Sequence, residues 1–150
     1  MSRKTVLITG ACGLVGSEAV CYFSEKGYRV IGVDNNMRGH FFDQAGSIQK
    51  NKEELIRRFP SFQLLEFDIR EQERVLHLFE QEEIDYVLHA AAQPSHDWAA
   101  REPLTDFSVN AIATQYLLEA VRTQQPEAVF AFLSTNKVYG DRPNDLPLIE

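Results

Sequence analysis

The sequence predicts a doubly wound α/β fold with one parallel sheet in the strand order 3-2-1-4-5. Short apolar runs alternate with longer amphipathic segments along the chain, which is the pattern of repeated βαβ units. A glycine-rich turn also stands directly between the first apolar run and the first amphipathic segment. Because crossovers between parallel strands are right-handed, these units give the stated order and a ligand crevice at the carboxyl ends of strands one and four.

Residues 5–9 form the first predicted strand, and the segment after the glycine-rich turn has the spacing of a helix that ends at Gly27. The side chains expected on the core-facing side of this helix are Val15, Ala19, Tyr22 and Phe23. Residues 28–33 form the second strand. Asp34 closes this strand at the edge of the sheet where the crevice is expected.

The middle of the chain is expected to contain a loop, a helix, a third strand and a further helix. Residues 35–47 are interpreted as the loop, and residues 48–59 as a helix that Pro60 stops. The third strand covers residues 62–67, and the next helix covers residues 71–83. The core-facing side chains of that helix are Val75, Leu78 and Phe79.

Residues 86–91 form the fourth predicted strand and residues 128–133 the fifth. Between them, a loop that contains Pro94 and Pro103 leads into the clearest helix of the sequence. The unbroken apolar stripe of this helix is Val109, Ile112, Ala113, Tyr116, Leu117, Ala120 and Val121. From Ser134 onward the chain is polar and contains further prolines.

The composition predicts one globular domain over residues 1–150. A net charge of −7 argues against nucleic-acid partners, and no apolar run reaches the roughly 18 to 20 residues of a membrane helix. The N-terminus lacks the pattern of a secretory signal, so we expect a cytoplasmic protein.

Cys12 and Cys21 do not have the spacing of a metal site, and no metal is expected. Cys12 is interpreted as a packing residue, with a reactive thiol at a helix N-terminus as the alternative.

Three glycines after the first strand form the pattern G-x-x-G-x-x-G, namely Gly10, Gly13 and Gly16. Between a strand and a helix, this pattern is typical of a Rossmann dinucleotide site, where the backbone approaches the pyrophosphate and the helix N-terminus supplies N–H donors. Within the same turn, the residues also expected to line the site are Cys12, Leu14 and Val15. The alternative is a tight turn without a ligand.

Asp34 favours NAD over NADP as the ligand of this site. A carboxylate at the end of the second strand accepts hydrogen bonds from both ribose hydroxyls and repels a 2'-phosphate. Arg38 is expected to stack on the adenine, with a phosphate contact as the alternative.

Asp68 and Ile69, at the end of the third strand, are expected at the adenine edge. For Asp68, an N-cap of the helix ahead of Glu71 is the alternative.

Six segments carry a resemblance to a known family: TGACGLVGS, VDNNMRG, FDIR, HAAAQ, VNAxxTxxLLEA and STNKVYGD. Together they resemble the extended short-chain dehydrogenases/reductases, specifically the NAD-dependent sugar-nucleotide epimerases and dehydratases. The resemblance covers the whole chain but only the N-terminal half of the family's length. Residues 134–141, with residues 92–95 upstream, most resemble the CDP-paratose (CDP-tyvelose) 2-epimerase branch.

The resemblance implies that NAD oxidises a sugar hydroxyl to a ketone and that the hydride returns to the other face of the intermediate. The substrate would be a nucleotide sugar, CDP-linked in the branch named above. Thr135 matches the family position that polarises the substrate oxygen, with a strand cap as the alternative. Asn110 matches the asparagine that supports the active-site end of the cofactor, or it satisfies backbone groups in a buried helix. The other residues expected around the cofactor are Asn35, Asn36, Ala90, Ala91, Ala92, Gln93 and Ser134.

The resemblance places the general base in a Tyr-x-x-x-Lys on a helix beyond residues 138–140, and no Tyr-x-x-x-Lys follows those residues in the 150-residue sequence. Tyr139 is not a substitute, because no lysine stands four residues after it, and it is expected to pack. We therefore expect that the substrate-binding half lies outside these residues and that the chain alone binds NAD without turnover. The alternative is a non-catalytic NAD-binding module that acts through a partner chain, or as a homo-oligomer, at the open edge of strand five.

The histidines give weaker signals. His96, Asp97 and Trp98 follow strand four, where they either reach the nicotinamide or the substrate, or form an ordinary surface loop. His89 is expected to be a core residue whose ring nitrogens are satisfied. His77 is expected to be a solvated helix residue.

Overall fold

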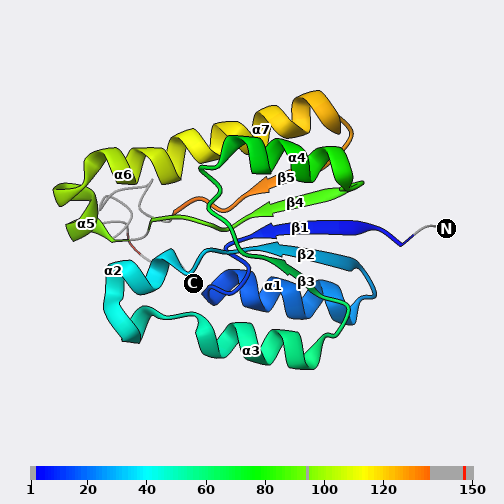
Figure 1. Ribbon diagram of the computed structural model, residues 1–150, viewed down its shortest axis with the longest axis horizontal. Helices are drawn as coiled ribbons and strands as arrows, with labels where there is room; N and C mark the ends of the chain where they lie inside the picture. The colour runs from blue at the N-terminus through cyan, green and yellow to red at the C-terminus, as the bar shows by residue number, and fades with distance from the viewer. Residues whose placement is uncertain (1–2, 94, 136–146, 148–150) are drawn as a thin grey trace.

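A parallel sheet of five strands lies between two layers of helices in the computed structural model, which describes residues 3–93, 95–135 and 147 (Figure 1). The strands are β1 (Thr5–Thr9), β2 (Arg29–Val33), β3 (Gln63–Leu65), β4 (Tyr86–His89) and β5 (Val129–Phe132). Their order is β3-β2-β1-β4-β5 and every pair is parallel, which confirms the predicted topology. β3 and β4 are shorter than predicted, so residues 66–67 and 90–91 lie beyond the strands.

Both faces of the sheet are covered by helices (Figure 1). The helices α1 (Leu14–Glu25) and α3 (Gln49–Arg58) cover one face, and α4 (Gln72–Gln81) and α7 (Ala113–Gln124) cover the other. Because side chains alternate along a strand, Val6 and Ile8 of β1 pack in the first core and Leu7 in the second. A strand with two covered faces must be apolar throughout, which explains the continuous apolar run of residues 5–9.

Three short helices gather at the carboxyl ends of the strands, at the left of Figure 1. They are α2 (Met37–Gly46), α5 (His96–Arg101) and α6 (Pro103–Phe107). The expectation of loops over 35–47 and around residues 94–103 was therefore wrong. Capping explains the first turns: the Asn35 side chain accepts a hydrogen bond from the Met37 backbone N–H, and the Ser95 hydroxyl accepts one from Trp98. Pro103 occupies the first turn of α6, where a missing N–H costs nothing.

The core-facing side of α1 also differs from the prediction. Ala19 and Phe23 pack against the core as predicted, but Val15 and Tyr22 are 53% and 56% exposed, and Gly16 and Val20 are buried instead. The helix is rotated because Gly16 lies against the Gly10 backbone, where a Cβ would come within 2.0 Å of the Gly10 carbonyl oxygen. Close packing of backbone on backbone, rather than the apolar spacing, thus sets which side of α1 faces the sheet.

The other predicted stripes are confirmed, with one irregularity. Val75, Leu78 and Phe79 of α4 are buried. The predicted helix over 109–121 begins with a π-helical segment, η1 (Ser108–Ile112), which continues into α7. From the predicted stripe, the buried members are Val109, Ala113, Leu117, Ala120 and Val121.

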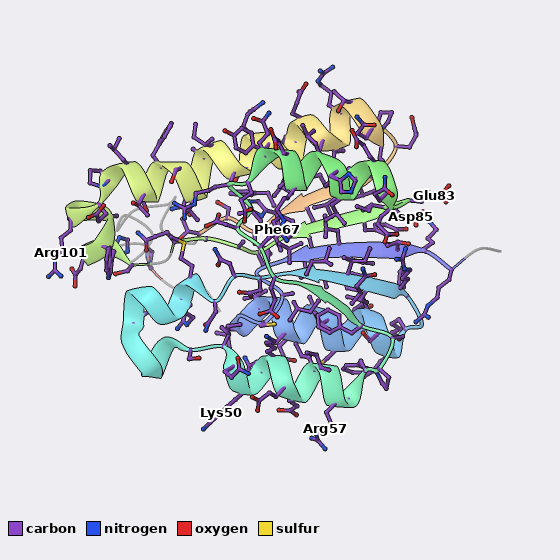
Figure 2. All side chains as sticks on the ribbon, in the orientation of Figure 1. Lys50, Arg57, Phe67, Glu83, Asp85 and Arg101 are labelled. Carbon is purple, nitrogen blue, oxygen red and sulfur yellow. The ribbon has the colours of Figure 1, made fainter. Side chains whose placement is uncertain are left out.

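Charged side chains lie on the outer surfaces of the helices. In Figure 2, Lys50 and Arg57 project from α3 away from the sheet, whereas Phe67 lies among the side chains between the sheet and α4. Within residues 3–93 and 95–135, no helix is both long and apolar enough to cross a membrane.

Candidate dinucleotide site

A cavity of about 260 Å³ opens at the carboxyl ends of β1, β2, β3 and β4, where the topology predicts a ligand crevice. Its lining includes thirteen residues predicted from the sequence: Gly10, Gly13, Leu14, Val15, Gly16, Asp34, Asn35, Arg38, Asp68, Ile69, Ala90, Ala91 and Ala92. Five lining residues were not predicted: Val33, Met37, Ile48, Phe67 and Val109. Small-molecule sites span about 300–1,000 Å³, so this cavity lies just below that range.

The glycine-rich turn brings backbone, rather than side chains, to the mouth of the cavity. Gly10 has a φ of +66° and its N–H donates to the Val33 carbonyl at 2.8 Å, which ties the turn to the end of β2. A Cβ on Gly10 would lie 2.8 Å from the Ala91 nitrogen, so the turn also touches the segment after β4. Gly13 precedes α1 and has no side chain to cap its first N–H groups. These N–H groups and the positive end of the helix dipole suit an anion.

Asp34 lines the cavity beside this turn. One carboxylate oxygen accepts the Cys12 N–H at 3.0 Å, and the other accepts the Asn36 N–H at 2.9 Å. The carboxylate therefore holds the turn in place and retains lone pairs toward the cavity. Asn36 itself has a φ of +57° and its side chain accepts the Ile48 N–H, so it shapes the turn into α2 and does not line the cavity.

Cys12 is a buried packing residue and does not line the cavity. Burial, together with the negative charge of Asp34, raises the pKa of its thiol to about 12. A thiol with such a pKa stays protonated near neutral pH, which argues against the alternative of a reactive cysteine. The backbone of Cys12 has a positional role, since its carbonyl accepts a hydrogen bond from the Asn51 side chain at 3.0 Å.

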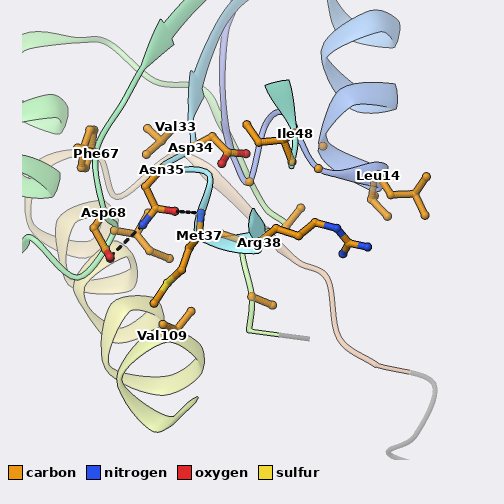
Figure 3. A pocket seen from close by; sticks show the side chains of 18 residues that line it. Leu14, Val33, Asp34, Asn35, Met37, Arg38, Ile48, Phe67, Asp68 and Val109 are labelled. Atoms are coloured by element: carbon orange, nitrogen blue, oxygen red, sulfur yellow. Dashed lines mark hydrogen bonds between the residues drawn. The ribbon is translucent and has the colours of Figure 1, made fainter. Parts of the chain in front are cut away.

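Asp68 and Asn35 form a hydrogen-bonded pair at the far end of the cavity (Figure 3). The Asn35 amide donates to Asp68 at 2.9 Å, while its oxygen accepts the Met37 N–H at 3.0 Å. Burial alone would raise the pKa of the Asp68 carboxyl, but hydrogen bonds and charge from Arg70 hold that pKa below its ordinary value. Asp68 also belongs to the turn before α4, where its N–H donates to the Glu71 side chain. The N-cap position itself is occupied by Glu71.

Asn110 and Gln93 support the segment after β4 from outside the cavity. The Asn110 side chain accepts the Gln93 N–H at 2.9 Å and donates to the Gln93 carbonyl at 3.3 Å. Both side chains also donate to one oxygen of Asp106, at 3.0 and 2.9 Å, and the Gln93 oxygen accepts the Ser95 N–H. Asn110 thus satisfies backbone groups, the second of the two roles considered for it.

A directed chain of hydrogen bonds fixes His89, which is 1% exposed. Thr114 donates to the Asn110 carbonyl at 2.8 Å, so its oxygen accepts from His89 Nε2 at 2.9 Å. His89 Nδ1 is then the acceptor for the Thr9 hydroxyl at 2.6 Å, and Thr9 in turn accepts the Ala91 N–H at 3.2 Å. Burial lowers the pKa of His89 to about 4, so the ring is neutral. The expectation of a satisfied core histidine is confirmed.

The residues predicted for the catalytic end do not line the cavity. Ser134 and Thr135 are exposed and follow β5, and Tyr139 lies outside the described residues. His96 and Asp97 are exposed in the first turn of α5, while His77 is exposed on α4 as expected. Among the described residues, no three His, Cys, Asp or Glu side chains are grouped closely enough for a metal ion.

Residues 6–150 match the profile of the NAD dependent epimerase/dehydratase family. The chain belongs to this family. The resemblance predicted from the motifs is thereby confirmed. Its curated relatives include CDP-paratose 2-epimerase of Salmonella typhi, 32% identical over 91% of this chain, and UDP-glucose 4-epimerase of Drosophila melanogaster, 34% identical over 100% of it.

Solved structures of family members share the fold. UDP-glucose 4-epimerase from Thermotoga maritima, solved with UDP-glucose, has a TM-score of 0.73 at 32% identity and matches 91% of this chain. UDP-glucose 4-epimerase from Bifidobacterium longum, solved with NAD+ and UDP, has a TM-score of 0.77 at 25% identity and matches 91% of this chain. The chain spans 38% and 42% of the two curated relatives named above, and 40% and 38% of these two structures.

Proposed function

We propose that this chain binds NAD and forms the cofactor-binding portion of a nucleotide-sugar epimerase or dehydratase. The observation that carries the proposal is the position of Asp34, whose carboxylate lines the cavity while both of its oxygens hold the backbone beside the glycine-rich turn. In this position the carboxylate can accept the ribose hydroxyls, and its charge opposes a 2'-phosphate.

The glycine-rich turn fits the remainder of the cofactor. Side chains at Gly10 or Gly16 would collide with backbone atoms, so only glycines allow the turn to close this tightly ahead of α1, whose first N–H groups are available to a pyrophosphate. The Arg38 guanidinium lies over the Phe42 ring, 5.0 Å from its centroid, and Figure 3 shows it directed toward Leu14 at the start of α1. When bound, NAD supplies the hydride acceptor that this chain's side chains lack.

The substrate class follows from family membership. The relatives are named for CDP- and UDP-linked sugars, and their identities of 32% and 34% are too similar to separate the two nucleotides. We therefore propose a nucleotide sugar, with Thr135 as the hydroxyl group that polarises the sugar oxygen. No Tyr-x-x-x-Lys follows residues 138–140, and Tyr22 and Lys26, which have this spacing, stand at the end of α1 and do not line the cavity. This chain by itself is therefore expected to bind NAD without epimerising a CDP- or UDP-sugar.

Isothermal titration calorimetry with NAD and with NADP tests the cofactor proposal. The wild-type chain should bind NAD more tightly than NADP. Asp34→Asn removes the charge but keeps an acceptor. It should lower the ratio of NAD affinity to NADP affinity by at least about tenfold, because the Asp34 carboxylate beside a 2'-phosphate costs several kcal/mol. The exposed Glu127→Gln is the control and should leave the preference unchanged. A wild-type chain that binds neither ligand, or that prefers NADP, would contradict the proposal.

A second candidate is a non-catalytic NAD-binding module that associates with another chain. The edge strand β5 favours it, since Val129 and Phe132 are 57% and 55% exposed there. Light scattering of the chain at increasing concentration measures self-association, and a turnover assay with NAD and a UDP-sugar separates the two candidates. Turnover by the chain alone would exclude the non-catalytic module. It would also show that residues other than the family's Tyr-x-x-x-Lys supply the general base.

A further inference from the structure

The Arg70 side chain connects three segments around the far end of the cavity without lining the cavity itself. Its guanidinium pairs with Asp68 after β3, with an Nη2–Oδ2 distance of 2.6 Å. Its other terminal nitrogen lies 3.4 Å from the Ser108 hydroxyl at the start of η1, and Nη2 lies 3.8 Å from the Met37 sulfur at the start of α2. A single charged group therefore links α2, η1 and the turn before α4.

Both oxygens of the Asp68 carboxylate accept hydrogen bonds in this arrangement. Its Oδ1 accepts the Arg70 backbone N–H at 2.9 Å and Nε at 3.0 Å. Its Oδ2 accepts Arg70 Nη2 and, at 2.9 Å, the Asn35 amide. Arg70 Nε also lies 3.1 Å from Oδ2 and is shared between the two oxygens. Asp68 therefore links Arg70 to Asn35, which Figure 3 shows bonded to both Asp68 and Met37.

The end of the cavity that this chain of contacts surrounds is lined largely by apolar side chains. The buried side chains that line it are Val33, Phe67, Ile69 and Val109. On the proposed function, the pyrophosphate lies at the glycine-rich turn and the ribose at Asp34, so the next part of the ligand toward β3 is the adenine. Because the walls come from α2, η1 and the segment after β3, the width available to a flat base depends on how these three segments are held together.

We propose that Arg70 is a positioning residue that sets the width of the base end of the cavity and thereby excludes bases larger than adenine. Arg70 makes contacts on all three walls, whereas Met37 and Val109 meet the ligand side directly. Loss of the guanidinium removes the contacts of Arg70 with Asp68, Met37 and Ser108 together. The walls can then separate, and a larger base can enter.

The test compares the affinities of NAD and of its 1,N6-etheno derivative, whose base carries an additional ring. In the wild-type chain the etheno derivative should bind more weakly by at least about tenfold, as expected when a tight apolar pocket receives extra carbon atoms. Arg70→Met has a side chain of similar length without the guanidinium, and it should reduce the ratio of NAD affinity to etheno-NAD affinity several-fold. Arg70→Lys keeps the positive charge but loses the planar pair of terminal nitrogens, and it should give an intermediate ratio.

Arg122→Met is the matched control, because Arg122 is exposed on α7 and pairs only locally with Glu119. Its ratio of affinities should equal that of the wild type. If Arg70→Met does not fold, Ser108→Ala, which removes only the contact with η1, must lower the ratio in the same direction. Equal weakening of both ligands, or an unchanged ratio, would overturn the inference, since a purely structural role gives that result. A wild-type chain that binds neither ligand would overturn the proposed function and this inference with it.

Discussion

Gly16 leaves no room for a side chain, because a Cβ there would lie 2.0 Å from the Gly10 carbonyl oxygen. Its neighbours are backbone atoms of the turn that connects β1 to α1, so they cannot move aside like a flexible side chain. The same contact explains why Gly16, rather than Val15, faces the sheet. The contact between Gly16 and the Gly10 backbone therefore determines both the shape of the turn and the orientation of α1.

Gly16→Ala should therefore lower both stability and NAD affinity. Overpacking of this kind costs about 1–3 kcal/mol, which urea unfolding measures directly. Gly27→Ala is the control, because Gly27 has a φ of +82° but nothing within 4 Å of its Cβ position. It should lose about 1–2 kcal/mol of stability through backbone strain and keep its NAD affinity. Unchanged affinity in Gly16→Ala would show that the turn is not part of the site.

His89 should make the stability of the fold depend on pH. Its pKa is lowered from 6.5 to about 4 by burial, so between these values the unfolded chain binds a proton that the folded chain does not. The stability contributed by the neutral ring is present above pH 6.5 and is lost as the pH falls toward 4, in total about 3 kcal/mol.

Chemical unfolding between about pH 7 and about pH 4.5 measures this loss. His89→Gln, which keeps a donor for Thr114, should remove most of the pH dependence assigned to this residue, whereas the exposed His77→Gln should not. A pH dependence that is the same in the wild type and in His89→Gln would contradict the assignment.

Among single residues, the sequence identified those that follow a strand or occupy the glycine motif. Asp34 and Asp68 were found this way, because the carboxyl ends of parallel strands meet at one edge of the sheet. Arg70 was missed as a functional residue although it stands in the FDIR segment, since its importance lies in contacts with Met37 and Ser108, which are distant in sequence. No local pattern reports such contacts.

At the scale of elements, apolar patterns identified α1, α4, α7 and all five strands, and the stop at Pro60 identified α3, but neither signal identified the helices at the carboxyl ends of the strands. α5 and α6 contain six and five residues, too few to show a helical period. The signal present in the sequence is the pair of capping side chains, Asn35 and Ser95. The π-helical segment η1 was also not predicted, because apolar spacing does not distinguish it from the α-helix into which it continues.

Asn110→Ala should loosen the segment after β4. It would leave the Gln93 backbone groups without their side-chain partner, at a cost of about 1–3 kcal/mol for buried unsatisfied groups. Hydrogen exchange should then be faster at the Gln93 amide, and NAD should bind more weakly because Ala90, Ala91 and Ala92 line the cavity. The exposed Gln115→Ala on the same helix should change neither. Unaltered protection of the Gln93 amide would contradict the supporting role of Asn110.

At the scale of the whole molecule, the predicted order of the sheet and the position of the crevice are both confirmed. They follow from right-handed crossovers between consecutive strands, a constraint that requires no knowledge of side-chain contacts. The catalytic end is different, since Ser134 and Thr135 do not line the cavity and the chain spans 38–42% of the relatives named above. A cavity just below the usual size of a small-molecule site agrees with part of a binding site rather than a complete one.

The most direct test of the central claim is an NMR titration of the 15N-labelled chain with NAD. The amide signals of Gly10, Gly13 and Gly16 should shift together with those of Asn35 and Ala91, because these residues line one cavity. Amides at the opposite end of the sheet, such as Asp85, should not shift. Saturable shifts confined to the cavity are the predicted result. No shifts at millimolar NAD, or shifts centred away from the glycine-rich turn, would contradict the claim that this turn binds the dinucleotide.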